Sequence, residues 1–115
     1  MALVQISQAQ ARVPVTVFQL QERVNLGNYQ ELEQAAKDAY DKGMRDLVMD
    51  LSQTPSLTSI GIRSLVVIYK LLATDSGKHF KLVGVIPPIR EMFDIAGITG
   101  FIEMYDSVDE AVASF

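Results

Sequence analysis

The chain has 115 residues, a hydrophobic content of 49% and a formal net charge of −4, and it contains no cysteine. A chain of this length fits one domain, which we expect over residues 1–115, and its composition argues against disorder. The acidic balance disfavours nucleic acid and anionic lipid as partners, and the lack of cysteine excludes disulfides and thiol catalysis. No apolar run is long enough to span a membrane and no secretory signal opens the chain, so we expect a cytoplasmic protein without direct membrane insertion.

The N-terminal third alternates apolar and polar side chains with the period of a β-strand. This alternation covers residues 4–7 and returns over residues 13–21, where valines are frequent. A period of two with β-branched residues predicts two half-buried strands, which we expect to pair as a hairpin. Asn28 then opens a helix, and Glu31 three residues later predicts a capping box.

Strands and helices alternate in the rest of the chain. The predicted elements are a strand over 47–51, a helix from about Ser59 to Thr74, a strand over 80–86, a helix from Pro87 to Gly97, a strand over 101–105, and a short helix capped by Ser107. Such alternation implies parallel strands joined by helical crossovers. We therefore predict an α/β fold with a central mixed, mostly parallel sheet of about five strands, about four helices and an N-terminal β-hairpin.

The stretch from Asp50 to Ile62 is the most informative part of the sequence. A buried strand ends at Asp50, a turn follows, and the hydroxyls of Thr58 and Ser59 then stand at the mouth of a helix. Asp50 is expected to bind backbone N–H groups of the loop that follows it, because buried polar groups are usually hydrogen-bonded. Either Ser59 or Thr58 caps the helix, depending on where its first turn begins. No nucleophile–base pair, metal-ligand cluster or cofactor fingerprint is readable, so we expect no enzyme, no metal and no cofactor.

The loops at the carboxyl ends of parallel strands share one edge of a sheet, and several polar or apolar residues fall on these loops. Capping and turn chemistry explain each of these residues alone, but their convergence predicts a surface for a partner protein. The predicted partner-binding residues are Asn25, Asn28, Thr58, Ser59, Ile60, Pro88 and Ile89. We expect Ile60 or Ile89 to be exposed there as an apolar anchor.

The order and spacing of these features resemble the STAS domain, which is shared by anti-sigma factor antagonists and sulfate transporter tails. Residues 50–52, Asp-Leu-Ser, match a family motif, and residues 58–62, Thr-Ser-Ile-Gly-Ile, stand where the family has Asp-Ser-Ser-Gly-Leu. Residues 82–90 and 96–98 are similar to the family's strand, proline, arginine-bearing helix and Ala-Gly-Leu. The resemblance extends from about residue 15 to residue 115 and implies a STAS-like β-α superhelix.

The resemblance also implies a function. In the antagonists of this family, the serine directly after the Asp is phosphorylated by a partner kinase that is also the anti-sigma factor. The dephosphorylated form binds that kinase and frees the sigma factor. By this resemblance Ser59 is the phosphoacceptor, with Thr58 as the alternative, and the partner is a serine kinase and anti-sigma factor. A phosphate at a helix N-terminus suits the helix dipole, so the fold would tolerate the modification while a partner surface would not.

Other interpretations remain open. Thr58 in place of the family Asp, and Ile60 in place of its second Ser, favour a non-phosphorylated STAS accessory or scaffold subunit, associated with a transporter or a signalling assembly. A third interpretation is ligand sensing at the strand ends near Asp50, where the sequence offers hydroxyls and amides but no cation for a phosphate. His79 is expected to be a solvated turn residue rather than a catalytic base, and Met92 to be core filler.

Overall fold

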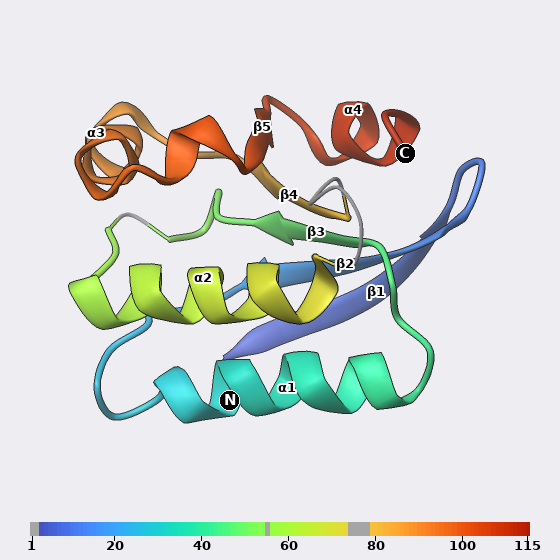
Figure 1. Ribbon diagram of the computed structural model, residues 1–115, viewed down its shortest axis with the longest axis horizontal. Helices are drawn as coiled ribbons and strands as arrows, with labels where there is room; N and C mark the ends of the chain where they lie inside the picture. Colours follow the sequence, from blue (N-terminus) through green and yellow to red (C-terminus); the bar gives the residue numbers. More distant parts are fainter. Residues whose placement is uncertain (1–2, 55, 74–78) are drawn as a thin grey trace.

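The predicted alternation of strands and helices is found in the structure. The computed structural model describes residues 3–54, 56–73 and 79–115 (Figure 1). Its elements are β1 (Val4–Gln10), β2 (Pro14–Leu20), α1 (Tyr29–Asp41), β3 (Leu47–Asp50), α2 (Ser59–Leu72), β4 (Phe80–Val83), α3 (Pro87–Ala96), the 3-10 helix η1 (Ile98–Gly100), β5 (Glu103–Tyr105) and α4 (Val108–Ala113). The predicted fold class is confirmed, and none of the helices described is both long and apolar enough to cross a membrane.

The five strands form one mixed sheet in the order β1-β2-β3-β4-β5. β1 and β2 form the predicted antiparallel hairpin, and the remaining neighbours are parallel. The carboxyl ends of β2, β3 and β4 therefore lie at one edge, and each is followed by a loop that leads into a helix (Figure 1). The chain thus brings its strand–helix loops to the same end of the sheet, as the sequence indicated.

Apolar cores lie on both faces of the sheet because alternate residues of each strand point to opposite sides. The larger core joins Phe18 and Met49 of the strands to Leu32 of α1 and Leu65 of α2. The smaller core joins valines of β2, β3 and β4 to Ala111 and its neighbour in α4. In Figure 1, α1 lies along the β1 side of the sheet and α4 along the β4–β5 side. β1 itself is mostly exposed, whereas β2 is buried on both faces.

Several boundaries differ from the prediction: β1 continues to Gln10, β3 ends at Asp50 rather than residue 51, and β5 begins at Glu103 rather than residue 101. β4 is shorter than predicted because Gly84 turns the chain with a φ of +71°, and a Cβ there would lie 2.8 Å from the backbone nitrogen of Ser52. The run of apolar residues continues past this turn, so the sequence pattern overstated the strand. α2 ends at Leu72, and the predicted end at Thr74 lies outside the described residues.

The predicted capping box at the start of α1 is wrong. Asn28 occupies the N-cap position, but its side-chain oxygen accepts a hydrogen bond from the N–H of Asn25 at 2.7 Å. The carboxylate of Glu31 accepts from the N–H of Leu3 at 3.3 Å. Both side chains are therefore bound to segments that precede the helix, which the local motif does not reveal.

The end of α3 allows a test of backbone strain. Gly97 has a φ of +80°, a left-handed conformation that L side chains rarely adopt, and open space surrounds the position of a Cβ there. We expect Gly97→Ala to lower the free energy of unfolding by about 1 kcal/mol, through backbone strain alone. Urea denaturation measures this loss. Gly100→Ala is the matched control, since Gly100 also has open space but no positive φ. An equal loss at both positions would contradict the assignment to the left-handed conformation.

Candidate partner-binding site

Thr58, rather than Ser59, caps α2. Thr58 has an extended backbone, with φ of −92° and ψ of 167°, and its Oγ1 accepts a hydrogen bond from the N–H of Gly61 at 3.2 Å. The same hydroxyl donates to the carbonyl oxygen of Val24 at 2.6 Å. This second bond joins the β3–α2 loop to the β2–α1 loop. The alternative in which Ser59 is the cap is therefore excluded, and the Thr58 proton is already donated within the protein.

Ser59 is the first residue of α2, and its side chain is exposed. Its hydroxyl forms no hydrogen bond with any residue that the structure describes. Since α2 is 14 residues long, its N-terminus carries the partial positive charge of a full helix dipole. Position 59 thus combines solvent access with a local electrostatic environment that favours an anion.

Asp50 is buried where β3 ends, and both of its oxygens are hydrogen-bonded. Oδ1 accepts from the N–H of Ser52 at 2.9 Å, and Oδ2 accepts from Nε2 of Gln19 at 3.3 Å. The carboxylate therefore holds the first turn of the β3–α2 loop against β2. This geometry is the one expected of a loop-structuring residue.

Asn25 and Asn28 hold the β2–α1 loop together from inside. Oδ1 of Asn25 accepts from the N–H of Gly27 at 2.8 Å, and Nδ2 of Asn28 donates to the carbonyl of Arg23 at 3.1 Å. Asn25 is exposed and Asn28 is half-buried. Together with the bond between Thr58 and Val24, these contacts place the predicted asparagines next to the start of α2.

The two predicted apolar anchors are not exposed. Ile89 has a relative exposure of 0%, so the expectation that it stands on the surface is wrong. Because α3 begins at Pro87, Ile89 and Phe93 fall on the same helix face and enter the larger core. Ile60 is half-buried, while Pro88 is exposed.

A groove that the sequence analysis missed begins at Ser59 and runs between α2 and α3. It has a volume of about 440 Å³ and is lined by Ser59, Ile62, Arg63, Val66, Met92, Ile95, Ala96 and Ile98. Ile95 is 82% exposed, the highest value for a large hydrophobic side chain among the described residues. Met92 was expected in the core but is only half-buried and lines the groove. The available signal was that the apolar residues of α3 extend beyond the face of Ile89 and Phe93, since Met92 is one turn from Ile89 and Ile95 is one turn further.

Arg63 stands one turn after Ser59 on α2 and lines the same groove. It is exposed and forms no ion pair with the residues described. Arg63 is thus a cation beside Ser59 that the sequence analysis did not name. An anionic group on Ser59 would have a guanidinium partner at the i+4 position of its own helix.

Other polar groups lie away from this groove. His79, expected to be a solvated turn residue, is half-buried, and its Nδ1 lies 2.7 Å from Oδ1 of Asp46. Asp46 immediately precedes β3, and His79 immediately precedes β4. A hydrogen bond to Glu103 raises the pKa of the Tyr105 phenol in β5. No group of three or more potential metal ligands occurs in the parts of the chain that the structure describes.

Comparison with known proteins assigns the chain to a family. The sequence profile of the STAS domain matches residues 7–111. The candidate anti-sigma factor antagonist BtrV of Bordetella bronchiseptica is 32% identical over 96 residues, which cover 84% of this chain and 82% of BtrV. The chain therefore belongs to the STAS domain family.

Solved structures share this fold. A candidate anti-sigma factor antagonist from Thermotoga maritima matches with a TM-score of 0.86 and 20% identity, covering 96% of this chain and 92% of that one. The Bacillus antagonist SpoIIAA, in its phosphorylated form, matches with a TM-score of 0.72 and 14% identity, covering 96% of this chain and 97% of that one. These likenesses show that the chain has the fold of the solved anti-sigma factor antagonists.

Proposed function

We propose that this protein is a regulator of transcription that binds a serine kinase acting as an anti-sigma factor, and that phosphorylation of Ser59 switches this binding off. The observation that carries the proposal is the exposed Ser59 hydroxyl at the N-terminus of α2, at the mouth of the apolar groove. Two relatives support it, because BtrV is named for antagonism of an anti-sigma factor and SpoIIAA has a phosphorylated form. In this proposal the protein works in the cytoplasm and has no catalytic role of its own.

The surroundings of Ser59 suit a switch because they affect the fold and the partner differently. A phosphate adds close to two negative charges at the positive end of α2, with Arg63 one turn away. The fold is therefore expected to tolerate the modification. A partner that covers the apolar groove would have to desolvate the phosphate, which costs several kcal/mol or more when a charge is left unpaired. Binding is lost while the domain remains folded.

The direct test is incubation of the full chain with its cognate kinase and ATP, followed by intact mass spectrometry. We expect a gain of one phosphate that Ser59→Ala abolishes, and tandem mass spectrometry should place it on Ser59 rather than Thr58. Ser59→Asp should weaken binding to the kinase without lowering the thermal midpoint, because an acidic residue suits this helix end. If no phosphate appears and Ser59→Asp binds like the unmodified chain, the switch is rejected.

Thr58 favours a second candidate function, that of a STAS accessory or scaffold subunit that is never phosphorylated. This residue replaces the acidic residue that precedes the phosphoacceptor in the family motif, and its hydroxyl is bound to Val24 and Gly61. A kinase that reads an acidic residue there would find none. Affinity purification from native cells separates the two functions. A small kinase and a sigma factor would support the first, and subunits of a transporter ATPase would support the second.

A further inference from the structure

β1 is an edge strand without the usual protection of an edge. It comes first in the sheet order, and no other strand that the structure describes pairs with its outer side. Its seven residues, VQISQAQ, include no charged side chain and no proline, and their register with β2 contains no bulge. Natural edge strands are usually blunted by one of these devices, because an open edge can pair with another chain. β1 therefore presents a long, neutral and regular edge.

The hydrogen-bond pattern of the hairpin shows which backbone groups face outward. The N–H of Gln21 donates to the carbonyl of Leu3 at 2.8 Å, and the N–H of Ala11 donates to that of Val13 at 3.2 Å. Hydrogen-bonded residues alternate along an antiparallel ladder, so the odd-numbered residues of β1 bond to β2. The backbone groups that face the open edge belong to Val4, Ile6, Gln8 and Gln10.

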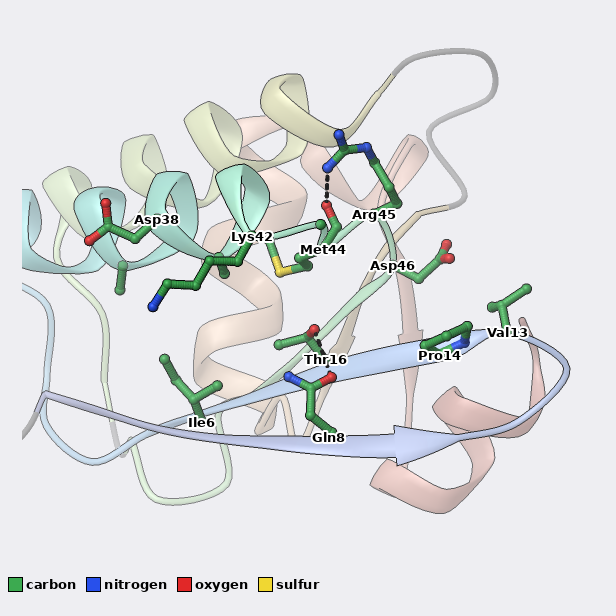
Figure 2. Close-up of a pocket in the computed structure, with 13 residues that line it drawn as sticks. Ile6, Gln8, Val13, Pro14, Thr16, Asp38, Lys42, Met44, Arg45 and Asp46 are labelled. Atoms are coloured by element: carbon green, nitrogen blue, oxygen red, sulfur yellow. Dashed lines mark hydrogen bonds between the residues drawn. The ribbon is translucent and has the colours of Figure 1, made fainter.

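A hollow of about 890 Å³ lies beside this edge, between β1 and α1. Figure 2 shows Ile6 and Gln8 rising from β1 on the side that α1 faces, with Lys42 reaching toward them from the C-cap position of α1. Ile6 is 49% exposed. Two of the four residues whose backbone groups face the open edge, Ile6 and Gln8, thus also line the hollow with their side chains. A strand added to β1 would form hydrogen bonds with the backbone groups of the open edge, and its own side chains would fill the hollow.

The charges around the hollow indicate the chemistry of that strand. Three of the four charged side chains are already engaged: Arg45 with the carbonyls of Tyr40 and Met44, Asp46 with His79, and Asp38 with Gln34. The ammonium of Lys42 has no partner among the described residues. In Figure 2 it points toward Ile6, whereas the Asp38 carboxylate points away. An acidic side chain on the added strand would match Lys42.

A second copy of the chain fits this place less well than a single strand. Two identical edge strands that pair in an antiparallel manner are related by a two-fold axis perpendicular to the sheet. The same face of the sheet therefore lies on the same side in both copies. Each copy would bring its own α1 to the junction, because α1 lies along the β1 side of the sheet (Figure 1). The neutral β1 of a second copy would also leave Lys42 unmatched. We propose that the open edge of β1 binds an extended segment of a partner protein by β-strand addition, with an acidic side chain of that segment paired with Lys42.

The test is a selection of octapeptides from a phage-displayed random library on the immobilised full chain, followed by fluorescence anisotropy with the selected peptides. We expect acidic peptides without central proline. Ile6→Lys should weaken their binding by about tenfold or more, because an edge lysine blocks strand pairing. Gln8→Pro removes an N–H that faces the open edge and no backbone bond to β2, so it should have a similar effect. Gln8→Ala should not, although it loses the same side-chain bond to Thr16 of β2 as Gln8→Pro does.

The charge requirement has its own control. Lys42→Glu should shift the selection from acidic to basic peptides, whereas Lys37→Glu, on the same helix but outside the hollow, should leave it acidic. The proposal is overturned if no selected peptide depends on Ile6, if Gln8→Pro binds like Gln8→Ala, or if Lys42→Glu leaves the preference unchanged. Sedimentation that shows a dimer broken by Ile6→Lys would assign the edge to a second copy instead. Since kinase binding is measured separately, these outcomes do not bear on the Ser59 switch.

Discussion

Replacement of Ile95 by lysine is expected to weaken binding of the kinase partner by about tenfold to a hundredfold, and to leave the fold intact. Ile95 is 82% exposed, so the free protein loses almost no packing when the side chain changes. Such surface changes usually alter stability by no more than about 0.5 kcal/mol. In a complex that covers the groove, the lysine would have to give up its hydration against Ile62 and Val66. Isothermal titration calorimetry with the purified kinase measures the affinity, and thermal unfolding monitors the fold.

Ile6→Lys is the matched control for this experiment. It makes the same replacement at another exposed isoleucine, on β1 rather than beside Ser59. We expect kinase binding to be unchanged, whereas binding of the strand-adding peptides should weaken by about tenfold or more. If Ile95→Lys binds the kinase as tightly as the original chain, the groove is not part of the interface. Equal weakening by both substitutions would instead indicate a general effect of the added charge.

The sequence was sufficient to predict the elements that depend on local signals. Alternation over 13–21 predicted β2, Pro87 predicted the start of α3, and Ser107 predicted the cap of α4. Each of these signals acts within a few residues, and the structure contains the element that each one predicts. The end of β4 was missed because it depends on a close approach between Gly84 and Ser52, which are distant in the sequence.

The site was harder to predict than the fold because it depends on how α3 is rotated. α3 carries apolar residues on two faces, and the pattern alone does not say which face enters the core. Packing directs Ile89 inward and leaves Ile95 in solvent, so the anchor was placed on the wrong face. The cap of α2 was similarly ambiguous, since Thr58 and Ser59 are both good capping residues. The bond from Thr58 to the carbonyl of Val24 decides between them, and it comes from another loop.

Replacement of Thr58 by valine should be among the most destabilising changes at this end of the molecule. Valine has the shape of threonine, so no cavity forms, but the hydroxyl that caps α2 is lost at a cost of about 1 kcal/mol. The carbonyl of Val24, a residue with 0% exposure, also loses its donor, which costs about 1–3 kcal/mol. We expect a total loss of about 2–4 kcal/mol and a fall in the thermal midpoint of roughly 10 °C. Urea denaturation and thermal unfolding measure the two quantities.

Three further variants show whether the bond between Thr58 and Val24 is the cause. Thr58→Ser keeps the hydroxyl and should lose less than about 1 kcal/mol, and Ser59→Ala should change stability by no more than about 0.5 kcal/mol. Thr58→Asp restores the family residue, and its carboxylate can still accept from the N–H of Gly61. It cannot donate to the carbonyl of Val24, and the two oxygens would repel, so we expect a loss close to that of Thr58→Val. If Thr58→Asp is as stable as the original chain, the bond does not explain why this protein carries threonine where its family carries an acid.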